Sequence, residues 1–247
     1  MIVEVDGQRV RFEVNGVGEP LLLLHGWGGQ IESFYPILTR LSEHFKIYVL
    51  DLPGFGDSDL PPAPWGSEDY ARFVTRFMAE LGVDRANVVG HSFGGRIAIR
   101  LAADFPKWVA QLVLVDSAGI RPRRGPNYYL RIALAKVGRR LLVGKLKQAL
   151  FNRLGSTDYR EAGAMQGTLV KTVNEDLRPL LAGIEAPTLL IWGERDEILS
   201  IRDAELMERE ISDATLVILE DAGHFSYLDR PQAFYTTVLE FLGSGSP

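Results

Sequence analysis

A serine, an aspartate and a histidine, each placed just beyond an expected strand, are the residues of this chain best suited to do chemistry. They are Ser92, Asp196 and His224, in that order along the chain. A neutral serine hydroxyl is a poor nucleophile, so an imidazole must take its proton and a carboxylate must hold the imidazole in the right tautomer. The sequence therefore predicts nucleophilic catalysis with Ser92 as nucleophile, His224 as base and Asp196 as orienting acid.

The serine lies in the motif Gly-His-Ser-Phe-Gly-Gly at residues 90–95. An apolar strand over 86–89 precedes the motif, and a helix over 96–103 follows it. Gly-x-Ser-x-Gly between strand and helix is typical of a nucleophile elbow, a sharp turn that exposes the serine hydroxyl above a sheet. A Cβ at Gly90 or Gly94 would collide with the turned backbone. The motif alone also fits an ordinary glycine-rich turn, and the later aspartate and histidine favour the catalytic interpretation.

The negative charge that develops on the substrate oxygen needs hydrogen-bond donors. The backbone N–H of Phe93 directly follows the nucleophile, and the N–H of Trp27 lies in a glycine-rich loop after an apolar strand. We expect these two groups to form an oxyanion hole, and the two side chains to line the acyl pocket. His25 is expected to fix the glycine-rich loop and His91 to pack inside the elbow, neither one transferring protons.

The acid has a second candidate in the sequence. Asp116 also follows an apolar strand, residues 112–115. Asp196 is favoured because it lies in the usual loop of the order serine, acid, histidine. Asp116 stays open as an alternative.

Short apolar runs predict the elements that must position these residues. Continuous runs of this kind are typical of strands buried on both faces of a parallel sheet. Segments with helical spacing separate them, and residues 2–14 read as a hairpin. Ser67 is expected to cap the helix that precedes the elbow strand. The pattern predicts an α/β fold with a mostly parallel sheet and helices on both faces; its apolar runs include 21–24, 47–50, 112–115, 188–192 and 214–219.

The alternation breaks over residues 121–184, where helices are expected at 128–137 and 139–151. We predict a helical cap there, inserted into a core domain of residues 1–120 and 185–247. Tyr128, Tyr129 and Met165 are candidates to line the substrate pocket. The segment carries 13 lysines and arginines against 4 aspartates and glutamates. This charge fits solvated helix faces, or else attraction of an anionic substrate or an acidic membrane surface.

Composition excludes several other classes of function. The 247 residues are 46% hydrophobic and 24% charged, as in ordinary globular proteins, and the net charge of -5 gives no reason to expect nucleic acid. Cysteine is absent and the 4 histidines lack metal-ligand spacing, so we expect no disulfide, no metal and no cofactor. No signal peptide and no apolar run long enough to span a bilayer is visible, so a cytoplasmic protein is expected.

The motifs together resemble the α/β-hydrolase family over nearly the whole chain. The resemblance rests on the glycine-rich loop after His25, the elbow around Ser92, Asp196, and the pair Gly223-His224. Within the family, the chain resembles the cap-bearing bacterial serine esterases and their C–C hydrolase relatives. The resemblance implies an α/β-hydrolase fold with the helical cap inserted after the sixth strand, and an oxyanion donor at the position of Trp27.

The resemblance also implies a function. We expect a carboxylesterase-like hydrolase that cleaves esters of small to medium acyl groups through an acyl-enzyme, with a small-molecule ester as its partner. Hydrolysis of a C–C bond in a diketone-like substrate, perhydrolysis and acyl transfer use the same triad and stay open as alternatives. A non-catalytic small-molecule receptor is disfavoured, because a pure binder has no need of all three residues. The sequence leaves monomer and dimer open.

Overall fold

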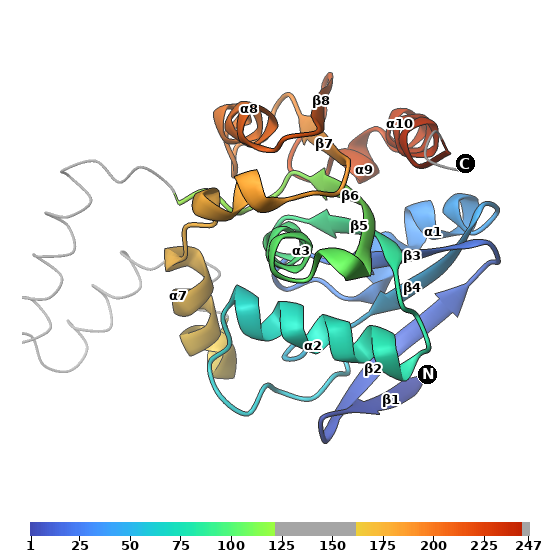
Figure 1. The fold of residues 1–247 in the computed structure, drawn as a ribbon, viewed down its shortest axis with the longest axis vertical. Coiled ribbons are helices and arrows are strands. Elements are labelled where there is room, and N and C mark those ends of the chain that lie inside the picture. The colour runs from blue at the N-terminus through green and yellow to red at the C-terminus, as the bar shows by residue number, and fades with distance from the viewer. Residues whose placement is uncertain (122–161, 244–247) are drawn as a thin grey trace, which may run out of the picture.

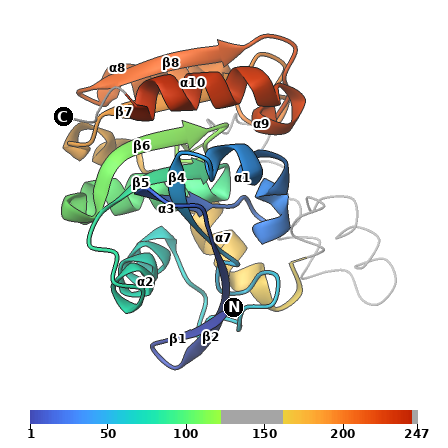
Figure 2. The ribbon, with the colours of Figure 1, turned by 90° about the vertical axis from the view of Figure 1, so that its right-hand side faces the viewer.

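A mostly parallel sheet of eight strands forms the centre of the protein, as the sequence predicts. The computed structural model describes residues 1–121 and 162–243. The strand order is β1-β2-β4-β3-β5-β6-β7-β8, with β1 and β2 antiparallel and the others parallel. Figure 2 shows β1 and β2 at one end of the sheet and β8 at the other. The strands are β1 Ile2–Val5, β2 Gln8–Asn15, β3 Glu19–Leu24, β4 Phe45–Leu50, β5 Ala86–His91, β6 Val109–Val115, β7 Thr188–Gly193 and β8 Ala214–Leu219.

Helices cover both faces of this sheet (Figure 1). α2, α3 and α8 pack on one face and α1 and α10 on the other, each face with its own buried apolar cluster. The α-helices are α1 Tyr35–Leu41, α2 Ser67–Glu80, α3 Phe93–Asp104, α7 Gln166–Asn174, α8 Ile201–Glu210, α9 Ser226–Asp229 and α10 Pro231–Gly243. Short 3-10 helices lie at Ile31–Phe34, Pro106–Trp108, Gly163–Met165 and Arg178–Gly183.

Parallel pairing brings the carboxyl ends of the central strands to one edge of the sheet. Catalytic and binding groups of open parallel sheets gather at this edge. The residue pairs nearest the edge are Leu24 with Gly90, His91 with Val115, Val115 with Ile191, and Gly193 with Leu219. The loops after β3, β5, β7 and β8 therefore meet there, although they are far apart in the sequence.

The start of α2 differs from the prediction. Gly66, not Ser67, is the N-cap residue, so the expected cap is wrong by one position. The Glu175 carboxylate accepts from the backbone N–H of Ser67 at 3.1 and 3.2 Å, and Asp69 accepts from that of Gly66 at 2.8 Å. A carboxylate 108 residues away in the sequence thus takes the capping role that a local serine was expected to fill.

The chain between β6 and β7 includes the predicted cap. Its described part, residues 162–184, holds α7 and two 3-10 helices and no strand. The helices predicted at 128–137 and 139–151 lie outside the described residues, and the division into core and cap stays a prediction. Of the helices that the structure describes, none is long and apolar enough to cross a membrane.

Candidate active site

Ser92 lies on a strained turn between β5 and α3. Its backbone has φ 51° and ψ −110°, a conformation that L-residues other than glycine rarely adopt. The turn is fixed on both sides, because the Ser92 N–H donates to the carbonyl of Val115 at 3.0 Å and the Ser92 carbonyl accepts from Ala118 at 3.0 Å. A Cβ at Gly90 would come within 2.6 Å of the Gly94 carbonyl oxygen. A Cβ at Gly94 would strike the carbonyl of Leu24 in the neighbouring strand.

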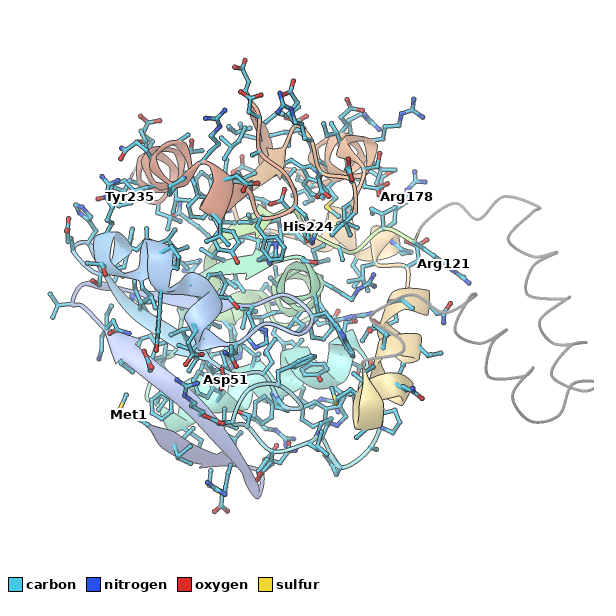
Figure 3. All side chains as sticks on the ribbon, turned by 180° about the vertical axis from the view of Figure 1, so that it is seen from behind. Met1, Asp51, Arg121, Arg178, His224 and Tyr235 are labelled. Carbon is cyan, nitrogen blue, oxygen red and sulfur yellow. The ribbon has the colours of Figure 1, made fainter. Side chains whose placement is uncertain are left out.

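The structure brings the three predicted residues into one chain of hydrogen bonds. His224 Nε2 lies 3.0 Å from Ser92 Oγ, and His224 Nδ1 lies 2.9 Å from Asp196 Oδ2. In Figure 3 His224 lies near the centre of the view. Its side chain is 10% exposed, and the side chain of Asp196 is fully buried. The imidazole of His224 is thus open to solvent at its edge, whereas the carboxylate of Asp196 is shielded from water.

Asp196 is held as a carboxylate by hydrogen-bond donors on both oxygens. Its Oδ1 accepts from the backbone N–H groups of Ile198 at 2.8 Å and Leu199 at 2.9 Å. Burial alone raises the pKa of Asp196, but the hydrogen bonds from His224, Leu199 and Ile198 outweigh it and lower the pKa below its ordinary value. The ionised Asp196 can only accept, so the proton of His224 sits on Nδ1 and Nε2 presents its lone pair to Ser92.

The loop after β3 is fixed by a buried histidine. His25 Nε2 accepts from the Leu52 N–H at 3.0 Å, so the ring proton is on Nδ1, which donates to the Gly26 carbonyl at 2.8 Å. Burial lowers the pKa of His25 to about 4, so this ring is neutral at physiological pH. The next residue is Trp27. Among the described residues no acceptor pairs with the N–H of Trp27 or with that of Phe93, the first residue of α3.

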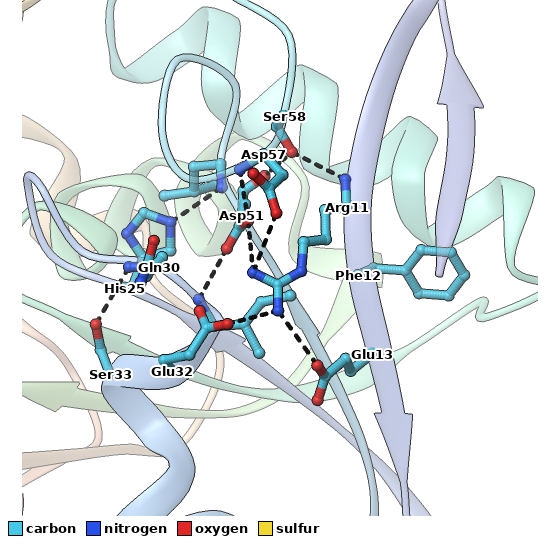
Figure 4. A network of polar contacts seen from close by, with 12 residues as sticks. Arg11, Phe12, Glu13, His25, Gln30, Glu32, Ser33, Asp51, Asp57 and Ser58 are labelled. Carbon is cyan, nitrogen blue, oxygen red and sulfur yellow. Dashed lines mark hydrogen bonds and ion pairs between the residues drawn. The ribbon is translucent and has the colours of Figure 1, made fainter.

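A second support of the same loop comes from Asp51, at the end of β4 (Figure 4). Its fully buried carboxylate accepts from the backbone N–H of Ile31 at 2.8 Å and of Asp57 at 2.9 Å. Arg11 lies 3.4 Å from Asp51 and 2.5 Å from Glu32, and these carboxylates raise the pKa of Arg11 further. Asp51 therefore joins the loops after β3 and β4.

Aromatic side chains pack beside the nucleophile. The rings of Trp27 and Phe93 lie 5.4 Å apart, and Phe55 contacts both at 5.0 and 5.9 Å between ring centroids. Tyr70 contacts Phe93 from α2 at 5.2 Å. Met165 is 5% exposed, and its thioether occupies the space in front of Gly54 next to Phe55. These side chains form a largely buried apolar cluster beside Ser92.

The alternative acid, Asp116, does not contact His224. Its carboxylate accepts from the backbone N–H groups of Gly193 and Ser226 and from the Ser226 hydroxyl. His91 lies beside the base, where its Nε2–H donates to the His224 carbonyl at 2.9 Å. Burial lowers the pKa of His91 to about 3, so the ring is neutral, in accord with a packing role.

The structure thus joins Ser92, Asp196 and His224, and places Trp27 and Phe93 together beside them. Tyr128 and Tyr129 lie outside the described residues. Sequence reasoning missed Phe55, whose only signal was its place in the glycine-rich loop after β4. Within the described residues no group of three or more histidine, aspartate or glutamate side chains could hold a metal ion.

Comparison with known proteins identifies the family of the chain. A family model described as the alpha/beta hydrolase family matches residues 21–237. The chain belongs to this family. A solved thermophilic esterase from Thermogutta terrifontis superimposes with a TM-score of 0.78, at 25% identity and over 100% of both chains.

Two curated relatives extend this likeness. The protein named pimeloyl-[acyl-carrier protein] methyl ester esterase from Aeromonas hydrophila is 26% identical over 95% of this chain and 99% of its own length. The dihydrolipoyllysine-residue acetyltransferase component of the acetoin cleaving system from Cupriavidus necator is 31% identical over 97% of this chain and 68% of its own length. The family, the Thermogutta esterase and the Aeromonas relative support a hydrolase.

Proposed function

We propose that this protein is a cofactor-free serine hydrolase that cleaves carboxylic esters of small to medium acyl groups through an acyl-enzyme. The observation that carries the proposal is the unbroken contact from Ser92 Oγ to His224 at 3.0 Å and from His224 to Asp196 at 2.9 Å. A nucleophile, a base and an orienting acid within hydrogen-bond reach are the geometric signature of an activated serine.

The first half of the reaction forms the acyl-enzyme. Ser92 Oγ attacks the ester carbonyl carbon while His224 Nε2 takes the hydroxyl proton. The imidazolium that forms faces the ionised, buried carboxylate of Asp196, which stabilises it. The tetrahedral intermediate then expels the alcohol, which leaves with the proton from His224.

The negative oxygen of the tetrahedral intermediate requires donors that are already in position. The N–H groups of Trp27 and Phe93, which have no acceptor among the described residues, are the donors that we assign to this oxygen. Losing one such donor typically lowers the rate by about 10²–10³-fold. The second half of the reaction repeats the first with water as the nucleophile and His224 as its base, and it releases the carboxylic acid.

The named relatives support two possible acceptors for the acyl group. An esterase passes the acyl group to water, as the name of the Aeromonas relative implies for that protein. The Cupriavidus relative carries an acetyltransferase name at 31% identity, which favours acyl transfer as the second candidate function. Both reactions share the acyl-enzyme at Ser92, and only the nucleophile of the second half differs.

Turnover of a graded series of p-nitrophenyl acyl esters tests the proposal. Wild type should hydrolyse the short esters, and Ser92→Ala should lower kcat by about a million-fold, as in another triad hydrolase. Ser42→Ala is the matched control. Ser42 directly follows α1, outside the site, and its hydroxyl donates to the Thr39 carbonyl. Persistent turnover by Ser92→Ala, with the control unchanged, would reject the proposed nucleophile.

An added alcohol distinguishes the two acceptors. Methanol that intercepts the acyl-enzyme yields a methyl ester in place of the acid, and gas chromatography measures the ratio of the two products. A ratio that follows the molar ratio of methanol to water indicates a hydrolase without a dedicated acceptor site. Strong preference for a particular thiol or alcohol at low concentration would favour the acyltransferase.

A further inference from the structure

The buried carboxylate of Asp116 lies between the two loops that carry Asp196 and His224. Asp116 directly follows β6 and is fully buried, with a positive φ of 42°. Its Oδ1 accepts from the N–H of Gly193 at 2.8 Å. Its Oδ2 accepts from the N–H of Ser226 at 3.1 Å and from the Ser226 hydroxyl at 2.6 Å. One side chain therefore binds the backbone of both neighbouring segments.

The two bonded segments are the supports of the proposed acid and base. Gly193 ends β7, three residues before Asp196, and Ser226 begins α9, two residues after His224. The bond between Asp196 and His224 depends on the distance between these loops, which start from different strands. We propose that Asp116, in its ionised state only, is a positioning residue that holds the Asp196 and His224 loops in register. This inference rests on the function proposed above.

Only a carboxylate of this size can bind both segments. Each oxygen of Asp116 faces a backbone N–H, one from Gly193 and one from Ser226. An asparagine in either orientation would turn its NH₂ group toward one of these donors and lose that bond. A protonated Asp116 is a weaker acceptor, because it has lost its charge and one of its oxygens carries a hydrogen. The ionised state is therefore the one that holds both loops.

The surroundings make protonation of Asp116 accessible. The pKa of Asp116 is raised to about 6, mainly by burial and further by the nearby Asp196 carboxylate. The hydrogen bonds from Ser226 and Gly193 lower this pKa, but by less. Tyr227 faces Asp116 from α9, and its own pKa is raised by burial and by the Asp116 charge. His91, from β5, contacts the Tyr227 ring and is neutral.

The pH dependence of kcat/KM carries the test. Protonation of His224 alone gives an acid limb of slope one in log kcat/KM against pH. Loss of the Asp116 carboxylate adds a second proton, so just below about pH 6 the wild-type slope should exceed one. Asp116→Asn imitates the protonated state at every pH. It should show slope one, with kcat lowered about tenfold to a hundredfold and KM nearly unchanged, since misplacement by about 1 Å costs up to 10²-fold.

Two further variants keep the test sharp. Ser226→Ala removes the shortest of the three bonds and keeps the carboxylate and both backbone donors, so it should lower kcat less and retain the steeper wild-type acid limb. Thr188→Val is the control, because it removes one buried hydroxyl, bonded to the Ala186 carbonyl at the amino end of β7, far along the strand from Gly193. It should retain both the wild-type kcat and the wild-type acid limb.

A measurement without substrate separates this inference from the proposed function. In ¹⁵N-histidine-labelled protein, the Nδ1–H signal of His224 reports its bond to Asp196 whether or not any ester is turned over. We expect this signal in wild type and in Thr188→Val at pH 8, and its weakening in Asp116→Asn. An unchanged signal in Asp116→Asn, or equal kcat and equal acid slopes in Asp116→Asn and wild type, would overturn the inference. So would an active Asp196→Asn beside an inactive Asp116→Asn, which would make Asp116 the acid itself.

Discussion

Replacing Asp196 by asparagine would change the tautomer of His224 without changing the shape of the site. Asp196 Oδ1 accepts from two backbone N–H groups, of Ile198 and Leu199. In Asp196→Asn only the amide oxygen can keep these two bonds, so the NH₂ group must face His224 Nδ1. Two donors cannot face each other, so Nδ1 gives up its proton and Nε2 carries it. A protonated Nε2 cannot take the proton of Ser92.

The size of the effect follows from this geometry. At an effective dielectric constant of about 20, two unit charges about 4 Å apart attract by about 4 kcal/mol, or roughly a thousandfold in rate. The wrong tautomer adds to this loss, and the same substitution in a serine protease lowers kcat by about 10⁴. We expect Asp196→Asn to lower kcat by about 10³–10⁴-fold, with KM for a p-nitrophenyl ester nearly unchanged.

The assay compares steady-state kinetics of wild type, Asp196→Asn and Asp84→Asn at pH 8. Asp84 is exposed in the turn before β5, so its substitution should leave kcat unchanged. A kcat for Asp196→Asn within tenfold of wild type would refute the reasoning. The acid would then have to be another group.

Three further predictions follow from the packing and charges around the site. Gly94→Ala should lower both Tm and kcat, because its Cβ would lie 2.7 Å from the His25 carbonyl oxygen. Gly183→Ala is the control and should change neither, because a Cβ there would have no neighbouring atom within 4 Å. Equal Tm values for Gly94→Ala and wild type would contradict the close approach at Gly94. Burial lowers the pKa of His25 to about 4 and that of His91 to about 3. Below pH 6.5 these two residues therefore bind more protons in the unfolded chain than in the folded one. The free energy of unfolding should fall as the pH is lowered from about 6.5 toward about 4. Calorimetric Tm values between pH 8 and pH 4.5 check this, and a flat profile would be inconsistent with two neutral buried histidines. Met165→Ala should lower the free energy of unfolding in urea by about 2–5 kcal/mol and shift the preferred acyl-chain length to longer esters. An unchanged preferred length would show that Met165 does not line the acyl pocket.

The central strands could be predicted because each is a continuous apolar run. A strand of a covered parallel sheet is buried on both faces, so the apolar runs at residues 21–24 and 188–192 can be recognised without any knowledge of their neighbours. The elbow could be predicted for a related reason. Only glycine fits at positions 90 and 94, since a side chain there would meet the backbone of the same turn or of β3.

The remaining features depend on partners that are distant in the sequence. Ser67 has the local chemistry of a helix N-cap, yet the carboxylate comes from Glu175, which lies 108 residues away within the predicted cap segment. Asp116 and Asp196 both follow strands, and only the path of the β8–α9 loop decides which of them reaches His224. Helix α9 has four residues, too few for a periodic pattern.

Covalent labelling of the nucleophile tests the central claim most directly. A p-nitrophenyl alkylphosphonate imitates the tetrahedral intermediate and bonds to a serine only where a base takes the hydroxyl proton. Peptide mass spectrometry of the labelled protein should find one phosphonyl group on Ser92, and none in Ser92→Ala or, within the same time, in His224→Ala. A phosphonyl group on another residue, or equal labelling of wild type and His224→Ala, would contradict a serine activated by His224.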